Sequence, residues 1–309
     1  MGPVEVLVVG DANPDLVLAG DVVPRFGQAE QLLDSADLVL GGSAAIVACG
    51  LARLGVPTAL AAAVGDDAFG RIVRDALGDR GVDLRWLRTD PDIPTGLSVV
   101  LAARDRAILT HPGTIAASGP ALLPDPEECR GVRHVHSASL FLLTALTPAL
   151  PAWLTALRAT GATVSVDTND DPSGAWDAAQ PVIDVSDVVL PNAAELRRLT
   201  GLDDLAAAGR ALCAGTRAVA LKDGAEGGAV WTPDGEVLRA PGLSVEVVDT
   251  TGAGDTFDAG FISGLVAGEP YDACLRRAVA AGSLSTRAAG GTGAQPTRAE
   301  LEAAVGGGR

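Results

Sequence analysis

Residues 249–261 read DTTGAGDTFDAGF and are the most informative part of the chain. Gly252 and Gly254 stand immediately before a run in which aromatic and aliphatic residues recur at helical spacing, so this run is predicted to be an amphipathic helix. A glycine-rich turn that enters a helix presents unpaired backbone N–H groups and the positive end of the helix dipole, which together form an anion hole. Asp255 stands at the start of that helix, where a carboxylate can act as the base for a hydroxyl that attacks a phosphoryl group.

The same turn also has a purely structural interpretation. Aspartate is a favoured N-cap residue, and many glycine-rich turns precede helices that bind nothing. Two other kinds of nucleotide site can be excluded by pattern. The chain has no GxxxxGK[ST] stretch, which excludes a P-loop, and no GxGxxG follows its first predicted strand, which leaves a dinucleotide-dependent oxidoreductase without support.

Outward from this segment, short apolar runs alternate with helical patterns along nearly the whole chain. Strands are predicted at residues 4–9, 58–64, 132–135, 162–166, 187–190 and 217–221. Helices are predicted at residues 43–54, 68–81, 151–160, 193–200, 255–267 and 272–286. Continuously apolar strands separated by helices are typical of a parallel sheet with both faces covered, so the sequence predicts an α/β fold.

Two stretches, at about residues 13–40 and 93–112, depart from this alternation. They contain short strand patterns that no long helix separates. We expect them to form a small β lid over the crevice at the carboxyl ends of the parallel strands, where open α/β sheets bind their ligands. No further domain boundary is visible, so residues 1–309 are expected to form a single domain with this discontinuous lid.

Composition limits the possible partners and compartment. The formal net charge of −16 argues against nucleic acid or an anionic membrane as partner. The N-terminal apolar run is too short for a signal peptide, and no stretch is long enough to span a bilayer. The four cysteines lie far apart and the three histidines are scattered, so neither a disulfide nor a metal site is predicted from them. A cytoplasmic location with buried, inert thiols is expected.

Five stretches, taken in order, resemble one family. Residues 249–261 match the pattern DTxGAGDxFxAGF, the second signature of the ribokinase-like (PfkB-type) carbohydrate kinases. The other stretches are GGSAAI with RLG at residues 41–55, VGDDAFG at 64–70, PNAAE with LTG at 191–201 and GAQPT at 293–297. The resemblance implies a three-layer α/β/α core with a β-sheet lid, and ATP-dependent, magnesium-dependent phosphorylation of a hydroxyl of a monosaccharide or sugar derivative.

The resemblance assigns the chemical step to the glycine-rich turn. It implies that Asp255 removes the proton of the substrate hydroxyl. The backbone amides around Gly252, Ala253 and Gly254 are implied to stabilise the transferring phosphoryl group.

A second group of residues matches the sugar-binding positions of the family. Asn13 and Asp15 are implied to bind substrate hydroxyls, and an amide beside a carboxylate suits vicinal hydroxyls. A simple Asx-rich turn at the end of the first strand is the structural alternative. Gly41 and Gly42 would let the backbone approach the sugar, or they are only the turn that starts a helix.

Ile46 is the clear departure from the family pattern, which usually has a sugar-binding asparagine there. Its side chain is expected in the first turn of the helix at residues 43–54, facing Asn13 and Asp15. A substrate without a hydroxyl at that point is one explanation, because an apolar side chain leaves a buried hydroxyl unpaired. The other is drift, with water or a neighbouring polar group replacing the amide.

A third group matches positions around the nucleotide. Asn192 and Glu195 are implied to lie near magnesium and the ATP phosphates, although Asn192 also suits a helix N-cap. Lys222 is the chain's only lysine and is followed by a loop containing Gly224 and Gly227 that resembles the family's nucleotide-contacting turn. Its amine would either pair with ATP phosphates or be solvated at a strand end.

Asp249 and Thr251 match the family's monovalent-cation loop, which implies activation by K⁺. The resemblance also implies a homodimer formed through the β lid. A nucleoside kinase of the same fold is the alternative function, and a non-catalytic sugar- or nucleotide-binding regulator is a further one. The intact Asp255 and glycine turn argue against the regulator.

Overall fold

The computed structural model describes residues 2–28, 30–103, 106–235 and 237–306. Within these ranges the larger sheet has the strand order β13-β12-β11-β10-β9-β8-β1-β4-β5. Its strands are β1 (Val6–Val9), β4 (Thr58–Gly65), β5 (Leu87–Asp90), β8 (His134–Ser137), β9 (Thr163–Val166), β10 (Val188–Val189), β11 (Ala218–Lys222), β12 (Gly228–Trp231) and β13 (Val237–Ala240). All pairs from β11 to β5 are parallel, whereas β12 and β13 extend the β11 edge as antiparallel strands.

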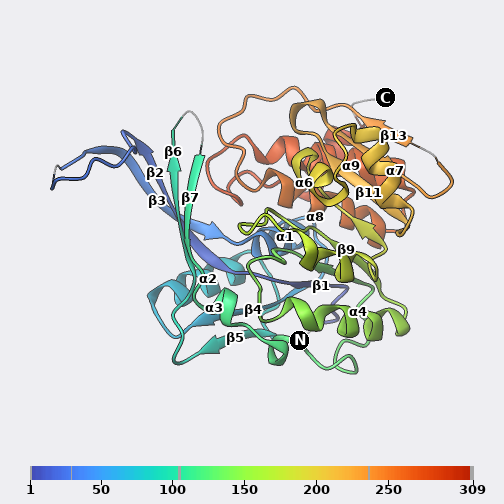
Figure 1. Cartoon of the computed structure of the whole chain (residues 1–309), viewed down its shortest axis with the longest axis horizontal. Coiled ribbons are helices and arrows are strands. Elements are labelled where there is room, and N and C mark those ends of the chain that lie inside the picture. Colours follow the sequence, from blue (N-terminus) through green and yellow to red (C-terminus); the bar gives the residue numbers. More distant parts are fainter. Residues whose placement is uncertain (1, 29, 104–105, 236, 307–309) are drawn as a thin grey trace.

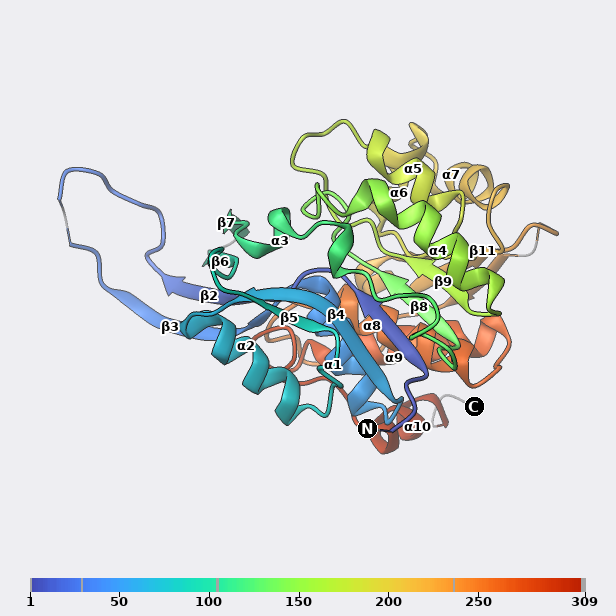
Figure 2. The same cartoon turned by 90° about the horizontal axis from the view of Figure 1, so that it is seen from below.

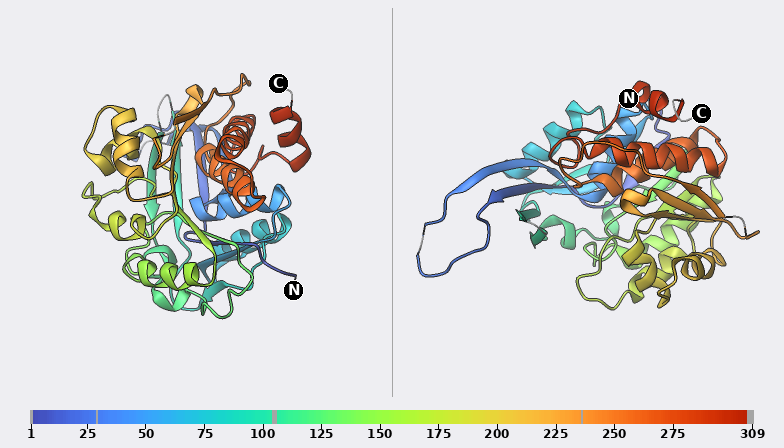
Figure 3. Two further views of the ribbon diagram at one scale, coloured as in Figure 1. Left: turned by 90° about the vertical axis from the view of Figure 1, so that its right-hand side faces the viewer. Right: turned by 90° about the horizontal axis from the view of Figure 1, so that it is seen from above.

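Helices cover both faces of this sheet, which gives three layers (Figure 1; Figure 3, left). One face packs against α4 (Leu150–Ala159), α5 (Gln180–Ile183), α6 (Ala193–Thr200) and α7 (Leu205–Cys213). The other packs against α1 (Ser43–Arg53), α2 (Ala68–Asp79), α8 (Ala253–Val266) and α9 (Tyr271–Ser285). The C-terminal helix α10 (Arg298–Gly306) packs outside α9.

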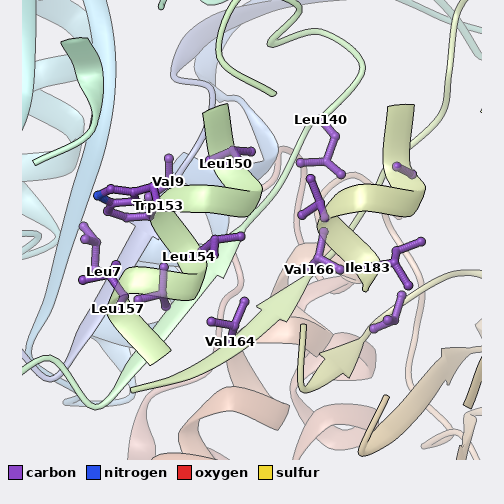
Figure 4. Packing of buried hydrophobic residues seen from close by; sticks show 14 of the residues in the cluster. Leu7, Val9, Leu140, Leu150, Trp153, Leu154, Leu157, Val164, Val166 and Ile183 are labelled. Atoms are coloured by element: carbon purple, nitrogen blue, oxygen red, sulfur yellow. The ribbon is translucent and has the colours of Figure 1, made fainter. Parts of the chain in front are cut away.

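The two-residue period of the strands divides their side chains between two cores. Leu7 and Val9 of β1 enter the core beneath α4, whereas Val6 and Val8 enter the core beneath α1 and α8. Figure 4 shows the first core, with α4 side chains such as Trp153 lying over β1. Both faces of β1 are therefore buried, which explains why its sequence is apolar at every position.

A smaller, separate sheet projects from the body (Figures 1 and 2). Its order is β3-β2-β6-β7, formed by β3 (Leu33–Gly41), β2 (Asn13–Gly20), β6 (Leu97–Ala102) and β7 (Arg106–His111). β2 and β3 are antiparallel, and Asn13 pairs with Gly41 at the base of the hairpin. β2 follows β1 after three residues and β3 leads directly into α1, so this base lies at the carboxyl end of β1.

The α/β fold predicted from the sequence is confirmed, and each predicted strand and helix overlaps an observed one. The antiparallel pair β12 and β13, the short β5 and the helix α7 were not predicted. Helix α8 begins at Ala253 rather than at residue 255, because Gly252 with φ 70° ends the preceding loop. All four cysteines are buried and free. Among the described residues no helix combines the length and the apolar character needed to cross a membrane.

Candidate active site

The base of the β2–β3 hairpin carries the predicted sugar-binding residues. Asn13 is 2% exposed, and its side-chain amide donates to Asp15 Oδ1 at 2.9 Å and to Ser98 Oγ at 3.4 Å. Burial, and then the nearby Asp11 carboxylate, raise the pKa of Asp15 to about 6. A Cβ atom on Gly41 would lie 2.1 Å from Asp15 Oδ1, so only glycine leaves room for this carboxylate.

The start of α1 lies directly beside this hairpin base. Gly42 is its N-cap with φ 86°, and the buried Asp11 side chain accepts from the Ala44 N–H at 3.0 Å. Ile46, in the first turn, is 4% exposed. Its Cδ1 atom lies 2.5 Å from where a Cβ on Gly291 would be, so this side chain packs against Gly291.

The glycine turn at residues 252–254 forms the N-terminus of α8, as predicted. Gly252 has φ 70°, and a Cβ there would lie 2.6 Å from Gly291 Cα, so both conformation and packing require glycine. A Cβ on Gly254, in contrast, would meet only Lys222 side-chain atoms at 3.5 Å or more. The Ala253 N–H donates to the Thr250 carbonyl at 3.2 Å, whereas the N–H groups of Gly254 and Asp255 have no backbone partner in the preceding turn. Free N–H groups at the start of a helix are the arrangement that binds anions.

Asp255 lies in the first turn of α8, beside these amides. Burial raises the pKa of its carboxyl to about 7; a hydrogen bond from Ser43 opposes this rise, and the Asp167 carboxylate adds to it. The Ser43 hydroxyl donates to Asp255 Oδ1. A carboxylate that titrates near neutral pH is well suited to accept a proton from an alcohol.

Lys222, at the end of β11, lies next to Gly254 of this turn. Its Nζ atom is 2.6 Å from Asp167 Oδ2 and 3.1 Å from Asp258 Oδ2, and its side chain is 9% exposed. Burial alone would lower the pKa of Lys222, but the carboxylates of Asp167, Asp258 and Glu195 raise it above its usual value. The interpretation of Lys222 as a solvated strand end is therefore wrong, because its amine is enclosed by carboxylates.

The carboxylates of Asp167, Asp255 and Asp258 lie within 4.8 Å of one another. Burial raises the pKa of Asp258 well above its usual value despite the opposing charge of Lys222. Neither Asp167 nor Asp258 was predicted from the sequence as a site residue. Asp167 follows a strand directly, at the sheet edge where ligands bind, and Asp258 stands three residues after Asp255 on the same helical face, so both had a usable signal.

Asn192 and Glu195 form a complete capping box at the start of α6. Asn192 Oδ1 accepts from the Glu195 N–H at 3.0 Å, and Glu195 Oε2 accepts from the Asn192 N–H at 2.9 Å. The capping role considered for Asn192 is thus present. Burial, followed by the Asp167 charge, raises the pKa of Glu195 to about 7. The Glu195 carboxylate therefore interacts electrostatically with Asp167 and Lys222.

A cavity of about 530 Å³ opens beside the anion hole. Its lining includes Lys222, Gly224, Gly227, Gly254 and Phe257. Its lining is mainly apolar, and its volume falls within the range of small-molecule sites. The predicted nucleotide-contacting glycines and the anion hole thus share one cavity.

Asp249 organises the loop that precedes the turn. Its Oδ1 accepts from the Thr251 N–H at 2.9 Å and from the Thr251 hydroxyl at 2.8 Å, and its Oδ2 accepts from the Gly290 N–H at 2.9 Å. Burial raises the pKa of Asp249, but these hydrogen bonds bring it below its usual value. Arg106 of the smaller sheet donates from Nη1 to Thr251 Oγ1 at 2.8 Å, which connects β7 with this loop.

Comparisons with known proteins agree with this geometry. The model of the family described as pfkB family carbohydrate kinase matches residues 4–298. An ATP-dependent ribose-1-phosphate kinase from Halopiger xanaduensis is 34% identical over 91% of this chain and 92% of its own. A ribokinase from Arabidopsis thaliana is 31% identical over 94% of this chain and 78% of its own. The structure of Arabidopsis thaliana ribokinase complexed with ribose and ATP superposes with a TM-score of 0.86 at 28% identity, covering 99% of both chains.

Proposed function

The chain belongs to the pfkB family of carbohydrate kinases, and from that premise we propose that Asp255 is the base that activates the sugar hydroxyl for transfer of the ATP γ-phosphoryl group. The observation that carries the proposal is the position of Asp255. Its carboxylate lies in the first turn of α8, next to the anion hole that also borders the 530 Å³ cavity. A base and an anion hole at one point are the two parts that phosphoryl transfer requires of the protein.

The proposed reaction transfers one proton to Asp255 and one phosphoryl group to the sugar. The hydroxyl proton passes to Asp255 while the hydroxyl oxygen forms a bond to the γ-phosphorus. The bond from that phosphorus to the bridging oxygen breaks, and ADP leaves with the electron pair. The free N–H groups of Gly254 and Asp255 donate to the phosphoryl oxygens, where they stabilise the charge that develops in the transition state.

Magnesium fits the charge of the site. Burial raises the pKa values of Asp255 and Glu195 to about 7, and the Asp167 carboxylate adds to this rise while Lys222 opposes it. Several carboxylates thus share a single lysine at this site. Carboxylate oxygens are the ligands that Mg²⁺ prefers, and Glu195 would hold the ion against the ATP phosphates. When bound, Mg²⁺ neutralises charge on the transferring phosphates.

We place the sugar at the base of the β2–β3 hairpin, against Asn13 and Asp15. Asp15 can accept from two hydroxyls, and Gly41 leaves the room that its carboxylate occupies. The smaller sheet then serves as the lid over the crevice, with Arg106 linking it to the loop of Asp249 and Thr251. A neutral monosaccharide whose primary or anomeric-side hydroxyl points to Asp255 is the proposed substrate.

We also propose that K⁺ activates the enzyme at the Asp249–Thr251 loop. The depressed pKa of Asp249 keeps this carboxylate anionic, and carboxylate and hydroxyl oxygens suit a hard cation. Initial rates at equal ionic strength should be higher in KCl than in LiCl or tetramethylammonium chloride. Equal rates in all three salts would contradict activation by K⁺. If Arg106→Ala then lowered the rate in all three salts, the Arg106 guanidinium would be the cation that acts at this loop.

The proposed function is tested by ADP release from MgATP with a panel of pentoses, hexoses, deoxy sugars and nucleosides. Sugar-dependent release in wild type and its loss in Asp255→Asn are expected. Turnover confined to nucleosides would support the nucleoside kinase alternative. Wild-type turnover in folded Asp255→Asn would rule out this residue as the base.

A further inference from the structure

Ser43, the first residue of α1, has no role in the mechanism described so far. Its hydroxyl nevertheless lies against Asp255 Oδ1, although 212 residues separate the two in the chain. The other neighbour of this hydroxyl is Asn169, whose Nδ2 atom lies 3.1 Å from Ser43 Oγ. Asn169 follows β9, so the contact brings the starts of α1 and α8 and the end of β9 to one point.

The direction of these hydrogen bonds can be derived from Asn169. Its Oδ1 accepts from the Ser139 backbone N–H at 2.7 Å, which fixes the orientation of the amide and leaves Nδ2 facing Ser43. An amide NH₂ group can only donate, so Ser43 Oγ must accept from it. The single proton of the Ser43 hydroxyl is then directed to Asp255.

The backbone around this contact is held in an unusual conformation. Ser139 has φ 59° and Asn169 has φ 56°, and the two residues closely follow the ends of the neighbouring parallel strands β8 and β9. Positive φ is tolerated by asparagine and is uncommon for serine. Such conformations are found mainly where the surrounding structure fixes them, often at functional sites.

We propose that Ser43 and Asn169 are positioning residues for the base, an inference that rests on the proposed role of Asp255. The Ser43 hydroxyl occupies Oδ1 and fixes the rotation of the carboxylate. Oδ2 is thereby left as the oxygen that receives the substrate proton. Asn169 acts through Ser43 by fixing the direction in which the hydroxyl donates.

The experiment compares kcat, KM and the pH dependence of kcat/KM in Ser43→Ala and wild type. A hydrogen bond to a charged group contributes roughly a ten- to hundredfold factor, so kcat should fall by about that much while the KM for sugar changes little. The acid limb of kcat/KM should move to higher pH, because the lost donor favoured the charged form of Asp255. Ser43→Thr retains the hydroxyl and should restore the wild-type acid limb.

Ser186→Ala is the matched control, since that buried hydroxyl donates to the Val182 carbonyl, away from the site. Asn169→Ala should lower kcat in the wild-type background. It should lower kcat less in Ser43→Ala, because Asn169 acts on Asp255 only through the Ser43 hydroxyl. An unchanged kcat and acid limb in folded Ser43→Ala, with Asp255→Asn inactive, would overturn this inference alone. A raised sugar KM with unchanged kcat would instead identify Ser43 as a substrate contact.

Discussion

At the scale of single residues, the proposed base works because its surroundings raise its pKa. Burial brings the pKa of Asp255 to about 7, and the Ser43 hydrogen bond keeps it from rising further. A base must be ionised to accept a proton, so activity requires a pH above this value. Glu195 titrates in the same range for the same reason, and its ionised form is the one that suits Mg²⁺.

We predict an acid limb in the pH profile of kcat/KM with a midpoint near pH 7. Activity should fall about tenfold per pH unit below the midpoint if one group dominates, and more steeply if Asp255 and Glu195 titrate together. The measurement is kcat/KM for the best sugar at saturating MgATP from pH 5 to 9. A profile flat down to pH 5 would mean that the base has the ordinary pKa of an exposed aspartate.

We predict that Asp255→Asn lowers kcat by about 10² to 10⁴ and stabilises the protein at alkaline pH. The native pKa lies above that of an unfolded aspartate, about 3.9, so wild type loses stability as pH rises from about 4 to 7. The variant carries no charge at this position, so its stability does not fall in this way as the pH rises. The free energy of unfolding of the variant should exceed that of wild type by about 4 kcal/mol at pH 8 and by about 1 to 2 kcal/mol at pH 5. An equal difference at both pH values would contradict the linkage.

At the scale of elements, the sequence predicts local features well and long-range pairings poorly. The N-terminus of α8 was predictable because glycine positions and helical spacing lie within one short stretch. The pairing of Lys222 with Asp167 spans 55 residues and depends on which strands become neighbours, which no local pattern records. The first-turn position of Ile46 was predictable, but its contact with Gly291 depends on a loop at the other end of the chain.

The two glycines of the turn should respond differently to substitution. Gly254→Val should reduce activity with little change in Tm, because a Cβ there meets only Lys222 at 3.5 Å and borders the nucleotide cavity. Gly252→Ala should lower Tm markedly, since its φ of 70° and a 2.6 Å approach to Gly291 leave no room for a side chain. Thermal melts and rates per folded molecule are measured for both. A large loss of Tm in Gly254→Val would favour a purely structural turn.

Replacing Lys222 should lower the free energy of unfolding, whether or not it also affects catalysis. Lys222→Met leaves Asp167 charged and buried, which costs about 3 to 5 kcal/mol when one partner of a buried pair is removed. Lys222→Met combined with Asp167→Asn removes both charges and should recover most of this loss. Urea denaturation measures both variants. A loss below about 1 kcal/mol in Lys222→Met would show that its environment is effectively aqueous. A raised KM for ATP in the double variant would add a phosphate contact to its role.

At the scale of the whole molecule, a chain with net charge −16 has to attract a highly anionic substrate. Positive potential is supplied locally, by the N-terminus of α8 next to Lys222. The acidic surface should still slow the association with MgATP at low salt, because like charges repel over distances of about 10 Å at 0.1 M ionic strength. Local dipoles thus bind a ligand that the overall charge repels.

The smaller sheet has two unlike faces. Asp15 lies on the face that also carries Arg106, which reaches the active-site loop, so this face is turned toward the crevice. The two-residue period of a strand sends Leu16 to the opposite face. The register places Leu38, Val99 and Leu109 in the same row as Leu16, which makes the outward face apolar. A largely uncovered apolar sheet face of this kind is typical of an interface.

We propose that a second copy of the chain covers this face, and we predict a dimer that single charges disrupt. Leu109 is 61% exposed on the outward face, and Ile108, its neighbour on β7, is 59% exposed on the opposite one. Burying a charge in an apolar interface is unfavourable, so Leu109→Asp should shift the protein from dimer to monomer. Ile108→Asp is the matched control and should leave the dimer intact. Sedimentation velocity over a range of concentrations measures both. A wild type that stays monomeric at high concentration, or equal dissociation by both substitutions, would exclude this face as the interface.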